Sequence, residues 1–247
     1  MSAWRGRRAA VLALGSVVLL LGPAAAIAQE GAQGQQTGFF GWLRASGSVG
    51  VAILLLSVAA IALAVEYALT LRRAALVPDE LRLALEELLA EGRIEEARAV
   101  VGEDTSFLGR VMAAGLIKRG ATERAVLEAI EDAGRAETNR LYRKVGYLAL
   151  IANVAPMLGL LGTVGGMMRS FDRIAAAGQP RVSELADGIR FALVTTYEGL
   201  IVAIPTTILF VVFRNRVARV AGEVAGVAEA LIARLRQRAA ARGAPAP

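Results

Sequence analysis

Three long apolar stretches constrain this chain more than any other feature. They cover residues 48–69, 145–168 and 189–213 and contain few charged residues. An α-helix rises 1.5 Å per residue, so about 20 apolar residues cross the hydrocarbon core of a bilayer. Composition agrees, because 55% of the residues are hydrophobic and 20% are charged, against roughly 45–50% and 25% in soluble domains. We therefore predict an all-α membrane protein with three transmembrane helices.

The first 28 residues have the pattern of a secretory signal peptide. A basic start precedes an apolar run, and Ala26-Ile27-Ala28 has the form of a cleavage site. An uncleaved short anchor is the alternative. Cleavage would leave residues 29–47 as a periplasmic N-terminal segment, rich in Gly and Gln, which we expect to be disordered or to lie at the membrane surface.

The residue types that are missing exclude several functions. The chain has no cysteine and no histidine, which excludes disulfides, Cys/His zinc sites and Ser-His-Asp triads. The net charge of +6 includes Arg5, Arg7 and Arg8 of the leader, and no basic stripe for nucleic acid remains without them. We therefore predict no enzyme, cofactor or bound metal. Proton or ion handling would fall to carboxylates, hydroxyls, carbonyls and water.

Basic residues near the span ends set the predicted orientation. Lys and Arg are enriched on the cytoplasmic side of membrane proteins. They cluster after the first span, before the second and after the third, at Arg72, Arg73, Arg82, Arg135, Arg140, Arg143, Lys144, Arg214, Arg216 and Arg219. The C-terminus is therefore predicted to be cytoplasmic, the N-terminus left by cleavage periplasmic, and residues 169–188 a periplasmic loop.

The segments predicted to be cytoplasmic are helical in pattern. Residues 70–144 have Ala, Leu, Glu and Arg at helical spacing and predict a domain of about four helices, with Thr105 and Thr122 as N-caps. Residues 214–247 are predicted to continue the third span as a long cytoplasmic helix to about Arg242, followed by a short tail.

The second span contains a stripe of small residues. Ala155, Gly159, Gly162 and Gly166 follow one another at helical spacing, which allows close contact between helices in lipid. Pro156 removes a helix hydrogen bond and so frees a carbonyl group at membrane depth. This pattern fits a helix-packing seam alone or a seam that also borders a pore.

The third span carries polar residues at membrane depth. Thr195, Thr196 and Glu198 lie within one turn, and Gly199 and Pro205 follow in the same packing and pore motif. A carboxylate inside the bilayer costs several kcal/mol unless it is paired, hydrated or protonated, and such residues typically mark ion or proton pathways. Glu198 is therefore a candidate for the proton path, with a structural interhelical hydrogen bond as the alternative.

One subunit has only two helices of this kind, which cannot enclose a channel. A channel would therefore require a homo-oligomer around a central axis. We expect spans two and three to face this axis and span one to face the lipid.

Two motifs stand out in the second and third spans, Ala155-Pro-Met-Leu-Gly-Leu-Leu-Gly-Thr-Val164 and Ala192-Leu-Val-Thr-Thr-Tyr-Glu-Gly-Leu-Ile-Val-Ala-Ile-Pro205. They resemble motifs of the MotA/TolQ/ExbB proton-channel proteins, most closely those of the ExbB and TolQ branch. Thr163 and Thr196 match the pore-lining threonines of the family, and Pro156 and Gly159 match its second-span motif. The order of three spans with a cytoplasmic helical insertion is also similar.

The resemblance implies a function and a set of partners. It implies a homopentamer in the bacterial inner membrane that surrounds an ExbD- or TolR-like partner, which has one span and a membrane aspartate. Proton flow would drive movement that a TonB- or TolA-like protein passes to transport or envelope processes. Either H⁺ or Na⁺ suits a threonine-lined pore, and the assignment to H⁺ rests on the resemblance and on a lone Glu without a cage of oxygen ligands.

One position departs from the family pattern. Many members have a glutamate five residues before the second threonine, where this chain has Phe191. Glu198 follows seven residues later, which is about two helical turns and nearly the same face. Our interpretation is that the acidic function has moved along the helix.

Two other functions are weighed against the proton channel. A non-conducting scaffold would assemble the transmembrane helices of a partner, with Glu198 as a buried strut. A MotA-like flagellar stator is less favoured, because that branch has four spans.

We predict that the leader is cleaved after Ala28. Intact-mass analysis of the membrane-bound protein should give the mass of residues 29–247. A mass that includes Met1 would instead support the uncleaved anchor.

Overall fold

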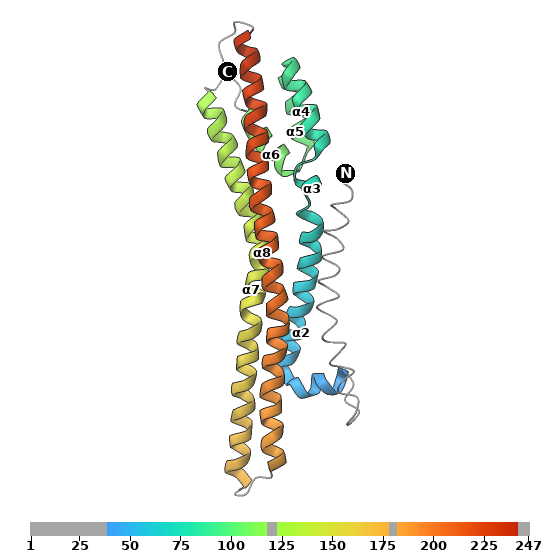
Figure 1. Ribbon diagram of the computed structural model, residues 1–247, viewed down its shortest axis with the longest axis vertical. Helices are drawn as coiled ribbons and strands as arrows, with labels where there is room; N and C mark the ends of the chain where they lie inside the picture. Colours follow the sequence, from blue (N-terminus) through green and yellow to red (C-terminus); the bar gives the residue numbers. More distant parts are fainter. Residues whose placement is uncertain (1–38, 118–122, 178–181, 242–247) are drawn as a thin grey trace. The chain divides into compact units, whose positions relative to one another are not determined.

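The described part of the chain is helical. The computed structural model describes residues 39–117, 123–177 and 182–241, and these ranges contain no strand. The predicted signal peptide, residues 29–38 and the C-terminal tail lie outside them. Figure 1 shows the helices, which are α2 (Phe39–Thr70), α3 (Arg73–Leu76), α4 (Asp79–Glu91), α5 (Ile94–Glu103), α6 (Phe107–Ile117), α7 (Glu123–Ala177) and α8 (Val182–Ala241).

The chain divides into two compact units that share the two longest helices. The first unit, here called the apolar unit, contains the described residues up to Ala68 and Gly146–Val211. The second, here called the charged unit, contains Leu69–Val145 and the described residues from Val212 onward.

In the described part of the chain, three helices are long and apolar enough to cross a membrane, as predicted. They are Gly47–Thr70, Arg124–Ala175 and Gly188–Leu235, and their most apolar windows are only 22%, 33% and 28% buried. Much of the exposed surface is formed by large side chains such as Leu55, which is 65% exposed. Lipid or further protein chains must therefore cover these helices.

The helices extend beyond the predicted spans. α7 continues to Ala177 and α8 begins at Val182, so most of the predicted loop 169–188 is helical. Hydropathy locates the first charged residue after a span, whereas a helix can continue past charged residues. The inner prolines, Pro156 in α7 and Pro205 in α8, lie within continuous helices.

The structure describes only the last part of segment 29–47, which was expected to be disordered or to lie at the membrane surface. From Phe39 onward it is helical, and a kink at Gly47 separates this part from the apolar helix. Gly47 has φ 58° and ψ −155°, which is a conformation that residues with a Cβ atom rarely adopt.

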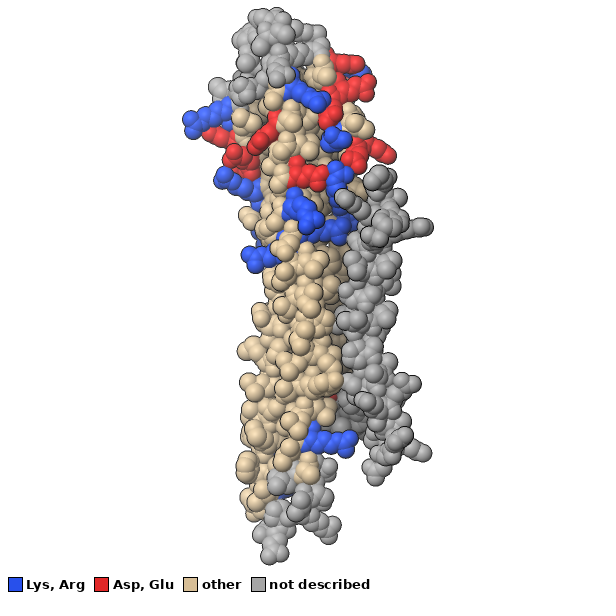
Figure 2. Space-filling model, in the orientation of Figure 1, with Lys and Arg blue, Asp and Glu red and all other residues tan. Residues whose placement is uncertain are grey.

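The charged unit is built from amphipathic helices and ion pairs. Leu81, Leu85 and Leu89 are spaced four residues apart on α4 and are all buried, as expected for one helix face. Figure 2 shows that Lys, Arg, Asp and Glu gather over this unit. Arg73 forms ion pairs with Asp79 at 3.1 Å and with Glu223 of α8 at 2.6 Å.

Two arginines of the charged unit differ in their electrostatic environment. Hydrogen bonds to Glu223 and then to Asp79 raise the pKa of Arg73 above its usual value. Burial, followed by the nearby charges of Arg72 and Arg219, lowers the pKa of Arg216. Like charges therefore crowd together just after Phe213, where the apolar run of α8 ends.

One helix cap was predicted at the wrong residue. Thr105 was expected to cap the helix that became α6, but the Gly109 backbone N–H donates to Oγ of Ser106 at 3.0 Å. Either hydroxyl could serve as a cap, and the turn made by Asp104, whose carboxylate accepts from the Ser106 N–H at 2.6 Å, places Ser106 in the capping position. Thr122 lies outside the described residues.

Glycines bring the backbones of α7 and α8 together in the apolar unit. A Cβ atom at Gly162 would lie 2.2 Å from Oγ1 of Thr195, and one at Gly159 would lie 2.9 Å from the Thr195 carbonyl oxygen. From the other side, a Cβ at Gly199 would lie 2.6 Å from the carbonyl oxygen of Ala155. These spacings leave no room for larger residues, as in other small-residue helix contacts in membranes.

We predict that Gly162→Ala lowers stability, because the added methyl group forces apart two packed helices. Overpacking of this kind typically costs about 1–3 kcal/mol. The matched control is Gly146→Ala in the same helix and unit, where a Cβ would meet nothing within 4 Å. Unfolding midpoints in detergent should fall for Gly162→Ala and not for Gly146→Ala. Equal midpoints for the two variants would contradict the close contact.

Candidate functional site

A file of buried polar side chains runs through the apolar unit. Among the residues whose burial is described, four polar ones there are almost fully buried: Ser170 at 4% exposure, Thr195 at 0%, Glu198 at 4% and Thr206 at 3%. Ser170 of α7 adjoins Gly188 of α8, since a Cβ at Gly188 would meet its hydroxyl. Along α8, the distance from position 188 to position 206 is about 27 Å. That length is close to the thickness of a bilayer hydrocarbon core, roughly 30 Å.

Thr195 and Thr196 meet α7 at one carbonyl group. The Gly159 oxygen lies 3.5 Å from Oγ1 of Thr195 and 3.3 Å from Oγ1 of Thr196. Thr195 Oγ1 also lies 3.0 Å from the Ala192 oxygen and 3.1 Å from the Phe191 oxygen. A hydroxyl donates one proton at a time, so these oxygens are alternative acceptors. The Thr195 hydroxyl can therefore donate to one or another of these oxygens without a change in backbone conformation.

Thr163 occupies a different environment. Its hydroxyl donates to the Leu160 oxygen of its own helix at 2.7 Å, and its side chain is partly exposed. Thr196 is also partly exposed. Two of the three threonines predicted to belong to the proton path or pore lining, Thr163 and Thr196, thus retain access to the surface of a single chain, whereas the third, Thr195, does not.

Glu198 lies inside the apolar unit. It follows Thr195 by three residues on α8 and is 4% exposed. Its carboxyl group therefore faces the interior of this unit, and only another conformation or an internal path would connect it with the surface of the chain. A carboxyl group in such surroundings is a candidate for proton exchange or for a structural hydrogen bond.

Other residues predicted for the site lie next to this file of polar residues. Gly159, Gly162, Gly166 and Gly199 lie in the contact between α7 and α8. Pro205 is followed directly by Thr206, whose hydroxyl donates to the Val202 oxygen at 2.6 Å.

Sequence reasoning missed two members of the file, Ser170 and Thr206. Thr206 is eleven residues after Thr195, which is about three turns and the same helix face. Extending the periodicity beyond Pro205 would have found it. Ser170 lies just after Arg169, where the second span was predicted to have ended, and so was not considered.

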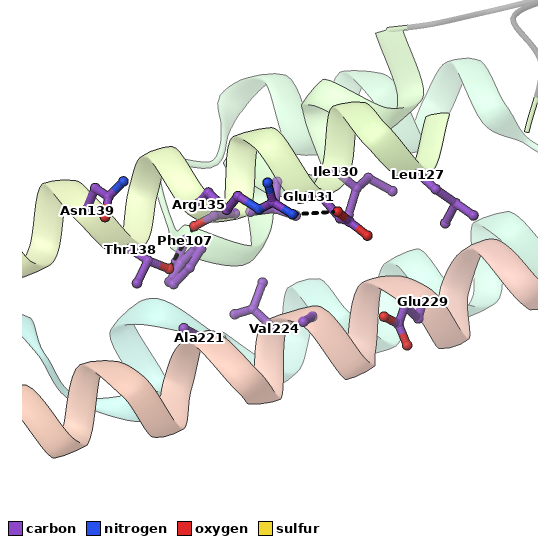
Figure 3. A pocket seen from close by; sticks show the side chains of 13 residues that line it. Phe107, Leu127, Ile130, Glu131, Arg135, Thr138, Asn139, Ala221, Val224 and Glu229 are labelled. Atoms are coloured by element: carbon purple, nitrogen blue, oxygen red, sulfur yellow. Dashed lines mark hydrogen bonds and ion pairs between the residues drawn. The ribbon is translucent and has the colours of Figure 1, made fainter. Parts of the chain in front are cut away.

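A hollow of about 740 Å³ lies in the charged unit, with an apolar floor and a polar rim. Figure 3 shows Glu131 and Arg135 of α7 in an ion pair on this rim, 3.0 Å apart, with Glu229 on α8. The lining residues are Phe107, Val111, Leu127, Ile130, Glu131, Gly134, Arg135, Thr138, Asn139, Ala221, Val224, Ala225 and Glu229. Across the described residues, no group of three or more His, Cys, Asp or Glu could hold a metal ion.

Comparison with known proteins places the chain in a family. The model of the MotA/TolQ/ExbB proton channel family matches residues 103–226. The ExbB-like 3 protein of Synechocystis sp. is 36% identical over 179 residues, which cover 69% of this chain and 82% of that protein.

Two further relatives are matched over shorter regions. The biopolymer transport protein ExbB of Salmonella typhimurium is 33% identical over 152 residues, or 55% of this chain and 61% of that protein. The Tol-Pal system protein TolQ of Pseudomonas aeruginosa is 36% identical over 101 residues, or 39% and 44%. The chain thus spans less than two thirds of these two relatives. The resemblance found in the two motifs is confirmed, and this membrane protein belongs to the MotA/TolQ/ExbB proton channel family.

Proposed function

We propose that this protein is the proton-channel subunit of an energy-transducing complex in the bacterial inner membrane, similar to ExbB and TolQ. The observation that carries the proposal is the buried file that contains Glu198, inside the unit formed by the three apolar stretches. Polar groups at such depth are costly, and they typically mark ion or proton paths. Family membership supplies the second support, because the family is described as one of proton channels.

The working form would be a homo-oligomer, a pentamer by analogy with the family. The transmembrane helices leave most of their apolar surface uncovered within one subunit, which supports further contacts with protein as well as with lipid. The central partner would be an ExbD- or TolR-like protein whose single span carries an aspartate. The movement driven by proton flow would be transmitted to a TonB- or TolA-like protein.

The polar residues would have two roles in this assembly. Thr163 and Thr196, which are partly exposed in one subunit, would line the pore beside the partner. Thr195 and Glu198 would form the branch of the path inside each subunit. The glycines of the seam and the two inner prolines would hold the helices that carry these groups.

The proposed topology places the charged unit in the cytoplasm and the N-terminus left by cleavage in the periplasm. The crowding of Arg72, Arg216 and Arg219 next to the end of an apolar helix supports this orientation. The proposed boundaries are the predicted ones, with spans at 48–69 and 189–213 and the middle span at 145–168.

A non-conducting scaffold is the second candidate function. The burial of Glu198 inside a single subunit favours it, because a carboxyl group there could act as a strut between helices and never take part in transport. A partner would then bind the assembled helices without any ion flow through them.

We predict that proton flux depends on Glu198. The protein would be reconstituted with an ExbD- or TolR-like partner in liposomes, and partner-dependent flux measured under an imposed proton gradient. Glu198→Gln should reduce the flux by roughly 10²-fold, the lower end of the effect of a positioned proton-transfer group. Thr163→Val combined with Thr196→Val should also reduce it.

The matched control is Glu66→Gln, which removes an exposed carboxyl group of α2 and should leave the flux unchanged. Equal proton flux in Glu198→Gln and wild type would show that Glu198 is a structural strut between helices and not part of the proton path. No flux in any sample that contains the partner would favour the scaffold. A sodium gradient applied in parallel distinguishes Na⁺ from H⁺.

A further inference from the structure

Phe191 lies where three helices of the apolar unit meet. A Cβ atom at Gly47 of α2 would be 3.3 Å from its Cε2 atom, and one at Gly166 of α7 would be 3.0 Å from its Cδ1 atom. The ring of this α8 residue therefore rests on the backbones of two other helices. Gly47 makes this contact in a left-handed conformation with φ 58°, which a larger residue would disfavour.

A positive charge covers the same ring. The Arg169 guanidinium carbon lies 4.0 Å from the centre of the Phe191 ring, a distance at which cations are attracted to aromatic faces. The Nε–H of Arg169 also donates to the Gly165 oxygen at 3.2 Å. Two separate interactions thus hold the guanidinium over the ring.

The covered ring stands beside the buried file, between the contact of Ser170 with Gly188 and the buried Thr195. Phe191, Thr195 and Glu198 are spaced four and three residues apart and share one face of α8. Thr195 and Glu198 are almost fully buried, whereas Phe191 is only partly buried. The distance along the helix from Phe191 to Glu198 is about 10 Å. A proton or water molecule that approaches Glu198 from the end of the unit that bears Gly47 would pass Arg169 and Phe191 before it reached Thr195.

We infer that Phe191 and Arg169 form a gate that controls access to Thr195 and Glu198 from the end of the apolar unit that bears Gly47. The ring blocks the path by its bulk, and the guanidinium repels other cations by its fixed charge. Fixed arginine charges exclude cations in other narrow pores by the same electrostatic effect. The inference rests on the proposed function and deepens it, because it assigns the control and selectivity of the same pathway to Phe191, which stands where many family members have a glutamate, and to Arg169, which lies outside the two motifs.

Carbodiimide modification of Glu198 measures this access without any need for transport. A hydrophobic, neutral carbodiimide reacts with protonated carboxyl groups, and peptide mass spectrometry gives the rate at each residue. Phe191→Ala should raise the rate at Glu198 severalfold, and Phe191→Leu should raise it less. The rate at Glu66, an exposed carboxyl group on α2, serves as the reference within the same molecule.

Leu193→Ala is the matched control. Leu193 is two residues away on α8 and is 66% exposed, so its truncation shortens an apolar side chain of the same helix without opening the file. An unchanged Glu198 rate in Phe191→Ala, or an equal rise in Leu193→Ala, would overturn the gate. The absence of Glu198 labelling in every variant would also overturn it.

The role of charge is tested with a cationic, water-soluble carbodiimide. Arg169→Gln should raise the Glu198 rate with the cationic reagent more than with the neutral one, and Arg169→Lys should preserve the difference. Equal effects of Arg169→Gln on the two reagents would show that the charge of Arg169 does not control access.

The labelling and flux experiments can fail separately. Faster labelling of Glu198 in Phe191→Ala, together with no proton flux in any sample, would retain the gate and reject the channel. Proton flux in wild type, together with unchanged Glu198 labelling in Phe191→Ala, would retain the channel and reject the gate.

Discussion

The close contact between α7 and α8 is the interaction on which the rest of the structure depends. Gly159 and Gly162 face Thr195 and Thr196 at distances that exclude a side chain. In lipid the hydrophobic effect does not drive helices together, so packing and interhelical hydrogen bonds must supply the stability. The same contact brings the Gly159 carbonyl group to two threonine hydroxyls. The same surface between α7 and α8 therefore provides both the close packing and the interhelical hydrogen bonds.

This contact explains how polar residues are tolerated in the apolar unit. Thr195 and Thr206 each have a backbone carbonyl oxygen within hydrogen-bond distance, which reduces the cost of burying a hydroxyl. Glu198 lies between them on α8. The arrangement keeps a titratable group away from lipid while leaving hydroxyls on both sides of it, which is a suitable arrangement for proton transfer and also for a rigid strut. Only measurements on Glu198 itself separate these two roles.

Sequence patterns predicted the parts of the fold that depend on one helix at a time. Three spans follow from the length of apolar runs, because the bilayer fixes that length. The helical nature of the charged unit follows from spacings such as that of Leu81 and Leu85. Local patterns were less reliable at boundaries, as Ser106 shows, since a cap depends on the turn that precedes it. The contact of Phe191 with Gly47 and Arg169 joins three separate helices, and no local pattern contains it.

The most direct test is to observe the protonation of Glu198. Infrared difference spectroscopy of the protein reconstituted with its partner records the carboxyl band of a protonated acid when the pH on one side of the membrane is stepped. A proton path through Glu198 predicts a band that follows the pH, is lost in Glu198→Gln and is kept in Glu66→Gln. A Glu198 band that stays constant while the pH changes on either side would contradict a role in proton transfer.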